Sequence, residues 1–153
     1  MVLIRLRRPR TDDAEIIHLI KTELIPLSHT AHPRDASVIR ELPKRLRRGI
    51  TFVASRTKTS KPRGFVHLMT AGDILLFDML AVHPKHRGKQ VGTMLMAQGE
   101  AYGRTQGCSI ARLFVDDINP RASRLYARIG YEAIRHYPEL RLYEMTKTLK
   151  LPF

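Results

Sequence analysis

A basic corner interrupts an apolar run near the middle of the chain, in the stretch LAVHPKHRGKQVGTML (residues 80–95). The apolar positions Val91 and Leu95 predict that a helix follows this corner. The first N–H groups of a helix lack intrahelical partners and carry partial positive charge, so they attract anions. Gly88 and Gly92 would let a phosphate approach the backbone closely. The stretch is therefore interpreted as a pyrophosphate site at a strand-to-helix turn.

Two common phosphate-binding motifs do not explain this corner. The GxxxxGK[ST] loop of nucleoside triphosphatases is absent, and the spacing of Gly88 and Gly92 does not fit GxGxxG. Attraction of an anion over a longer range would come from the basic side chains of the corner, Lys85, His86, Arg87 and Lys89.

The hydrophobic periods predict the elements that position the corner. Strands are expected at residues 2–6, 50–55, 65–69, 74–82, 110–115, 131–137 and 140–149. Helices are expected at about 11–26, 36–48, 88–105 and 119–130. This order predicts one α/β (α+β) domain over residues 1–153, with a central mixed sheet covered by helices. Strands 74–82 and 110–115 are expected to be parallel, because a crossover helix joins them.

Two helix starts are predicted from capping residues. Thr11 is placed as an N-cap before acidic residues, which favour the first turn of a helix. Asn119 is a second N-cap, and Pro120 occupies the first helical position. Gly130 is expected to take the left-handed conformation that ends this helix.

Composition limits the class of protein. The 153 residues include a single cysteine, Cys108, and carry a formal net charge of +13. One cysteine cannot form an internal disulfide, which suits a reducing compartment. There is no zinc-like spacing of cysteine and histidine, so no metal site is predicted. Neither a signal peptide nor a membrane span is predicted, and a cytoplasmic location is expected.

A family resemblance is carried by two motifs. LAVHPKHRGKQVGTMLM resembles the acyl-CoA-binding motif of the GCN5-related N-acetyltransferase (GNAT) superfamily, in which [RQ]xxGx[GA] opens a helix. Arg87 and Gly92 match that pattern, whereas Gln90 stands where the family most often has glycine. NPRASRLYARIGY, residues 119–131, resembles the family's second motif. IRLRRPRTDDAEII and LYEMTKTL resemble the family's two ends, so the likeness covers nearly the whole chain.

The resemblance implies a fold and a cofactor. The fold would be a mixed, mostly antiparallel sheet of about seven strands, flanked by about four helices. A V-shaped splay would separate the strands at 74–82 and 109–115. The cofactor would be acetyl-CoA, because the family uses coenzyme A thioesters. The resemblance places it against Leu80, Ala81, Val82, Arg87, Gly88, Lys89, Gln90, Val91, Gly92, Thr93, Asn119 and Tyr126.

The resemblance also implies acetyl transfer to a primary amine, by direct attack through a tetrahedral intermediate. Tyr126 is the implied general acid, although its position also suits core packing. Asp78 is the candidate base, directly or through water, and a solvent-facing strand position explains it equally well. Asp116 and Asp117 lie near the expected acceptor side. His67 and His83 are weaker candidate bases, and Cys108 is expected to pack rather than react.

Two other classes of function stay open on the sequence. A non-catalytic acyl-CoA-binding protein would keep the fold without the chemistry. A basic nucleic-acid-binding module would explain the charge, but aromatics are only 7% of the chain, which disfavours it. The acceptor, a small molecule or a protein N-terminus, is unidentified. Its pocket is expected from Ser28 to Ala36, the loop near Thr57 and the closing strands. Association as a homodimer stays open.

Overall fold

A seven-stranded sheet organises the chain, with strand order β1-β2-β3-β4-β5-β7-β6. The computed structural model describes residues 1–27 and 36–150. The strands are β1 (Leu3–Leu6), β2 (Ile50–Ser55), β3 (Pro62–Ala71), β4 (Ile74–Val82), β5 (Ile110–Asp116), β6 (Glu132–Tyr137) and β7 (Leu142–Thr148). All neighbours pair antiparallel except β4 and β5, which are parallel. The predicted mixed sheet and its parallel β4–β5 unit are therefore confirmed.

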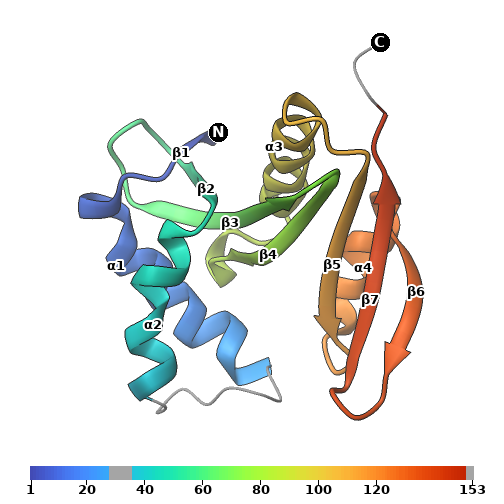
Figure 1. Ribbon diagram of the computed structural model, residues 1–153. Helices are drawn as coiled ribbons and strands as arrows, with labels where there is room; N and C mark the ends of the chain where they lie inside the picture. The colour runs from blue at the N-terminus through green and yellow to red at the C-terminus, as the bar shows by residue number, and fades with distance from the viewer. Residues whose placement is uncertain (28–35, 151–153) are drawn as a thin grey trace.

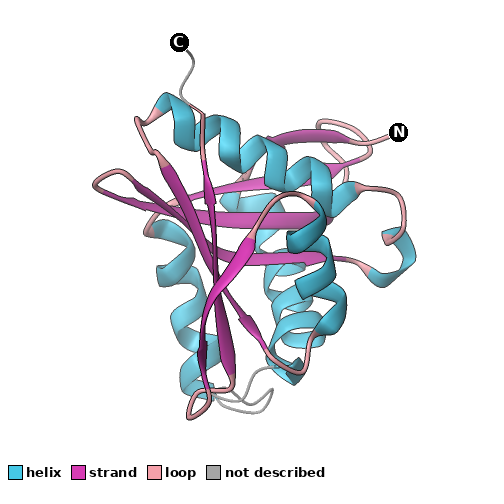
Figure 2. Ribbon diagram, turned by 90° about the vertical axis from the view of Figure 1, so that its right-hand side faces the viewer, coloured by secondary structure: helices cyan, strands magenta, loops and turns pink. Residues whose placement is uncertain are grey.

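Helices cover both faces of this sheet (Figure 2). They are α1 (Pro9–Leu19), α2 (Ala36–Arg47), α3 (Val91–Thr105) and α4 (Pro120–Arg128), with a π-helical turn at Ile20–Leu24 that extends α1. One apolar core packs α3 against the sheet and also contacts α4. A second core packs α1 and α2 against the opposite face of β2, β3 and β4.

A bulge in β4 changes which face of the sheet its side chains reach. His67 of β3 pairs with Met79, but the next residue, Leu68, pairs with Phe77, so Asp78 is the extra residue. Before the bulge, Phe77 belongs to the core under α3. After it, Met79 belongs to the core under α1 and α2. A bulge bends a strand and increases its twist, so β4 turns away at Asp78.

The expected splay between β4 and β5 follows from this bulge. The two strands pair from Ile74 with Ile110 to Phe77 with Leu113, and their pairing stops there. Beyond that point β4 continues beside β3 only, while β5 continues beside β7. Figure 1 shows β3 and β4 diverging from β5, β7 and β6. The V-shaped opening thus begins at the residue that the bulge inserts.

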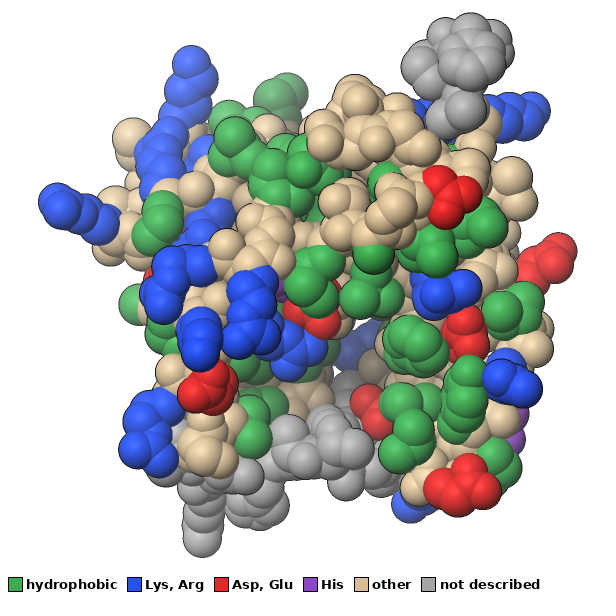
Figure 3. Space-filling view, viewed as in Figure 1, with side chains coloured by type: hydrophobic (Ala, Val, Ile, Leu, Met, Phe, Trp, Pro, Cys, Tyr) green, Lys and Arg blue, Asp and Glu red, His purple; other side chains and the backbone are tan. Residues whose placement is uncertain are grey.

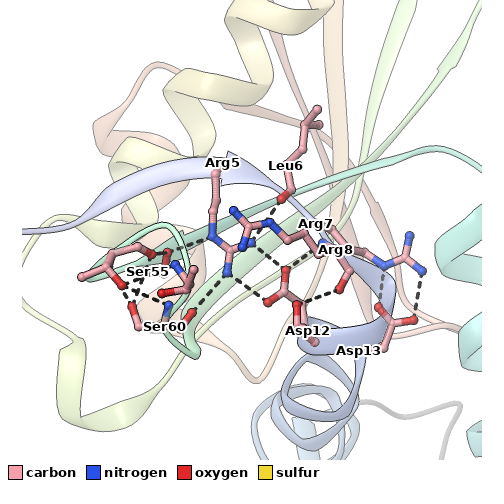
Figure 4. Close-up of polar contacts among 11 residues, drawn as sticks. Arg5, Leu6, Arg7, Arg8, Asp12, Asp13, Ser55 and Ser60 are labelled. Atoms are coloured by element: carbon pink, nitrogen blue, oxygen red, sulfur yellow. Dashed lines mark hydrogen bonds and ion pairs between the residues drawn. The ribbon is translucent and has the colours of Figure 1, made fainter.

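The start of α1 corrects one prediction. Thr11 was expected to cap this helix, but α1 begins at Pro9, after Arg8. Asp12 supplies the capping contact instead, because its Oδ2 accepts the Arg8 N–H at 2.8 Å. The Arg5 guanidinium donates to both oxygens of the same carboxylate, through Nη1 to Oδ2 at 2.7 Å and through Nη2 to Oδ1 at 3.0 Å (Figure 4). A proline at the first helical position needs no N–H partner, which favours the earlier start.

The start of α3 is also later than predicted. The helix begins at Val91 rather than Gly88. Gly88 and Gln90 both have positive φ, +75° and +63°, so the backbone before Val91 cannot be helical. By contrast, the signals around α4 are confirmed: Asn119 caps the helix, Pro120 follows it, and Gly130 has a φ of +104°.

Candidate functional site

The corner between β4 and α3 presents a row of unpaired backbone donors. Along the chain from Gly88, the first backbone N–H that donates to a carbonyl oxygen is that of Met94. Its acceptor is the Gln90 oxygen, at 3.0 Å. Within the described part of the chain, the N–H groups of residues 88–93 donate no hydrogen bond. The positive φ of Gly88 and Gln90 shapes this turn. Unpaired N–H groups at the start of a helix form a cradle for an anion.

A cavity of about 450 Å³ lies against this cradle, between the end of β4, the start of α3 and α4. It brings together almost every residue predicted to bind a cofactor: Leu80, Ala81, Val82, Arg87, Gly88, Gln90, Val91, Gly92, Thr93, Asn119 and Tyr126. Lys89 belongs to the same turn but is not in the wall of the cavity. The predicted residues therefore converge on one side of the splay.

Three arginines of α4 in the same wall were not predicted from the sequence. Arg121, Arg124 and Arg128 line the cavity together with Arg87. Their spacing of i, i+3 and i+7 puts them on one face of a helix, and that spacing is the signal that could have revealed them. Among the acids, Glu23 lines the cavity and forms an ion pair with Arg87. The cationic side chains outnumber it, so the cavity suits a polyanion.

A second cavity, of about 290 Å³, lies on the other side of the splay. Its wall shares Leu24, Leu80, Asn119, Ala122 and Tyr126 with the first cavity. The face seen in Figure 3 is hollowed between the half that carries α2 and the half that carries β5 and β7. The two cavities therefore meet where β4 leaves β5, and Tyr126 belongs to both.

Asp78 lies in the wall of the second cavity and is held by Arg45 of α2. The guanidinium donates through Nε to Oδ2 at 2.9 Å and through Nη2 to Oδ1 at 2.7 Å. Hydrogen bonding to Asp78 raises the pKa of Arg45. Each carboxylate oxygen still has a lone pair available. Arg45 was not predicted, because nothing local links residues 33 positions apart.

His67 lies behind Asp78 and is fully buried. Its Nδ1 and Thr51 Oγ1 share a hydrogen bond, 2.8 Å apart. Its Nε2 is 3.7 Å from Asp78 Oδ2 and makes no hydrogen bond with a described residue. Burial lowers the pKa of His67, and Asp78 opposes this effect only in part. The imidazole is therefore neutral near pH 7.

Tyr126 reaches the junction from α4 and is kept in place by aromatic packing. Its ring meets the edge of Tyr131 at 6.1 Å between centroids. Burial raises the pKa of Tyr126 to about 12. Asn119, beside it, uses Oδ1 to accept the Ala122 N–H at 3.2 Å, which confirms its capping role. Its amide N–H₂ makes no hydrogen bond within the described residues.

The other candidate bases lie in different surroundings. Asp116 lines the second cavity, whereas Asp117 contacts His136 at 3.3 Å and Arg141 at 3.8 Å, and neither cavity includes it. His83 uses Nδ1 to accept the Lys85 N–H at 3.1 Å, away from Tyr126.

The three segments predicted to form the acceptor pocket have different outcomes. Residues 28–35 of the predicted segment lie outside the described residues. The loop near Thr57 borders a separate hollow, lined by Arg56, Ser60 and His83. Of the closing strands, Leu142 lines the second cavity.

Two wider searches complete the survey. Over residues 1–27 and 36–150, no cluster of three or more His, Cys, Asp or Glu side chains has the arrangement of a metal site. None of the helices in that part of the chain is long and apolar enough to span a membrane.

Comparisons with known proteins agree with this geometry. The profile of the acetyltransferase (GNAT) family matches residues 15–131. Nourseothricin acetyltransferase is 25% identical with a TM-score of 0.63, over 67% of this chain and 66% of that chain. The chain thus spans about two thirds of the length of that protein. A search of curated proteins finds no match.

Two further solved structures cover nearly all of the chain. PaiA N-acetyltransferase from Thermoplasma acidophilum, solved in complex with coenzyme A, has a TM-score of 0.79 at 20% identity, over 97% of this chain and 99% of that one. The ribosomal-protein-S18-alanine N-acetyltransferase from Escherichia coli has a TM-score of 0.74 at 16% identity, over 100% of this chain and 97% of that one. At these identities the likeness is one of fold.

Proposed function

Because the chain belongs to the acetyltransferase (GNAT) family, we propose that it transfers an acetyl group from acetyl-CoA to a primary amine. One observation carries the proposal: two cavities, one on each side of the β4–β5 splay, share a wall at Tyr126. A transferase with two substrates needs such a meeting point, since the reacting atoms must come within about 3–3.5 Å of each other.

The first cavity fits acetyl-CoA, which supplies an acetyl group activated as a thioester. Coenzyme A carries roughly four negative charges near neutral pH. The free N–H groups of residues 88–93 and the arginines of α4 would hold its phosphates. Lys89 would add attraction from the rim. The backbone groups of Leu80, Ala81 and Val82 on the side that β5 leaves would pair with the amides of the pantetheine arm, because unpaired strand groups seek partners.

Tyr126 is the proposed general acid. A pKa near 12 keeps its phenol protonated at neutral pH, ready to give the proton to the departing sulfur. Its place in the walls of both cavities supports this role. Asn119, whose amide N–H₂ has no hydrogen-bond partner among residues 1–27 and 36–150, would orient the cofactor beside it.

Asp78 is the proposed base for the amine, directly or through a water molecule. Its carboxylate lines the acceptor cavity, and the ion pair with Arg45 fixes its orientation. A carboxylate whose orientation is already fixed loses less conformational entropy when it accepts a proton from the amine or from a bridging water. The exchange would remain direct, with no acyl group on the protein. Cys108 is fully buried, and burial raises the pKa of its thiol, so it is a poor nucleophile.

The deciding experiment is calorimetric titration with acetyl-CoA, with ATP and a short RNA as controls at the same salt concentration. Saturable binding of acetyl-CoA, followed by amine-dependent release of the coenzyme A thiol, is expected. If acetyl-CoA binds but no amine causes release of the thiol, the protein is a carrier of acyl-CoA rather than an enzyme. RNA binding without acetyl-CoA binding would overturn the proposal.

A further inference from the structure

We infer that the acceptor of this transferase is a primary amine carried on a small apolar body, alkyl or aromatic. The inference rests on the proposed function and concerns the second cavity, which the family match does not assign to any acceptor. The relatives described above are named for different acceptors, nourseothricin and an alanine of ribosomal protein S18. The identity of the acceptor must therefore come from the walls of this cavity.

Most of the residues that line the cavity are apolar, and they come from both halves of the splayed sheet. They include Leu42 of α2, Met79 of β4, Leu142 of β7, and Leu113, Phe114 and Val115 of β5. Phe114 is 47% exposed, so its ring is available for contact with a ligand in this cavity. A ligand body packed on such a wall gains by removing apolar area from water.

The charged groups of the cavity are few. Asp78 stands where β4 leaves β5, and Arg45 is already paired with it. Asp116, at the end of β5, also takes part in an interaction within the chain. The Asp78 carboxylate lines the cavity and attracts the ammonium form of an acceptor amine.

The position of Asp78 sets the direction in which the amine must point. The cavity shares Leu80 and Tyr126 with the cofactor cavity. An amine drawn to Asp78 faces that junction, while the rest of the molecule lies along the apolar wall. The volume of about 290 Å³ is at the low end for ligand pockets, so the body that enters is small.

The inference can be tested with matched pairs of acceptors. Release of the coenzyme A thiol is followed at saturating acetyl-CoA with 2-phenylethylamine against ethylamine, and with leucinamide against glycinamide. The first pair represents free small amines and the second represents peptide N-termini. In at least one pair, kcat/KM is expected to be about tenfold or more higher for the apolar member.

Phe114→Ala provides the test on the protein side. The side chain is half exposed, so its loss should not unfold the chain, and acetyl-CoA titration checks this. We expect the preference for 2-phenylethylamine over ethylamine to fall by about fivefold. Ile134→Ala is the matched control, since Ile134 is 56% exposed on β6 and lines neither cavity. It should leave the preference unchanged.

The outcomes separate the inference from the proposed function. Equal rates within both pairs, or faster reaction of spermidine than of 2-phenylethylamine, would overturn the apolar acceptor while leaving acetyl transfer intact. An unchanged preference in Phe114→Ala would reject this cavity as the acceptor site. Failure to bind acetyl-CoA at all would reject both proposals.

Discussion

At the scale of single residues, the phenol of Tyr126 is the group whose loss should be most informative. Tyr126→Phe keeps the ring that packs against Tyr131 and removes only the acidic proton. We expect kcat to fall by about 100-fold, the usual contribution of a positioned acid, while the Kd for acetyl-CoA changes by less than about twofold. Thiol release and calorimetric titration on the same preparation measure the two effects.

A neighbouring tyrosine supplies the control for this prediction. The hydroxyl of Tyr131 donates to Glu100 at 2.8 Å, and Tyr131 lines neither cavity. Tyr131→Phe should therefore leave kcat nearly unchanged. Equal losses in the two variants would mean that a general disturbance from removing a buried hydroxyl, and not proton transfer, accounts for the effect of Tyr126→Phe.

Glu23 is a second residue with a defined expectation, because it would compete with the phosphates of the proposed cofactor for Arg87. Its carboxylate is paired with that guanidinium and also places negative charge in the cofactor cavity. We expect Glu23→Gln to tighten acetyl-CoA binding by roughly fivefold, the equivalent of about 1 kcal/mol. Titration at low and high salt measures it, since salt should reduce the difference. Glu41→Gln, a change at an exposed position of α2, should have no such effect.

At the scale of elements, the turn before α3 includes a residue of unfavourable type. Gln90 has a φ of +63°, a conformation that costs a side-chain-bearing residue roughly 1 kcal/mol relative to glycine. We expect Gln90→Gly to raise the free energy of unfolding by up to about 1 kcal/mol and to preserve acetyl-CoA binding. Gly88→Ala should do the opposite. A Cβ there would meet no atom within 4 Å, so backbone strain alone explains any loss. Urea unfolding measures both.

The elements also separate what sequence predicts from what it does not. Asn119, Pro120 and Gly130 act through the backbone beside them, so the bounds of α4 could be predicted. The bulge at Asp78 could not, because it depends on the pairing of β4 with β3. The predicted start of α1 was wrong, because Pro9 at the first helical position and the contact of Asp12 with the Arg8 N–H, rather than Thr11, mark where this helix begins. Motif residues converged on the cofactor cavity, whereas the contact of Arg45 with Asp78 required the folded chain.

At the scale of the whole molecule, the net charge of +13 has two parts. One part lines the first cavity, where Arg87 and the arginines of α4 lie. The rest is spread over the surface, as the Lys and Arg side chains in Figure 3 illustrate. A chain with so much positive charge is destabilised by further protonation. The change in the free energy of unfolding at low pH therefore depends on which buried groups can accept a proton.

Two buried groups predict acid sensitivity in separate pH windows. Burial lowers the pKa of His67, so below pH 6.5 the unfolded chain binds a proton that the folded chain refuses. Stability is then lost as the pH falls from 6.5 to the lower folded pKa, with a slope of at most about 1.4 kcal/mol per pH unit. Burial acts to raise the pKa of Asp12, but hydrogen bonds from Arg5 and the Arg8 amide outweigh it and lower that pKa. The contribution of Asp12 to the free energy of unfolding is complete above pH 3.8 and is lost only as the pH falls through its pKa in the folded chain.

The His67→Gln variant isolates the upper window. Its stability at pH 7 is expected to be lower, because the hydrogen bond with Thr51 is disturbed, but the slope between pH 6.5 and 5 should become shallower than in the parent chain. Urea unfolding at half-unit pH intervals gives that slope independently of the starting level. His86→Gln is the comparison, since that side chain is only half-buried and should change the slope less. If His67→Gln and the parent chain lose stability in parallel, folding does not lower the pKa of His67, and this explanation of the upper window is wrong.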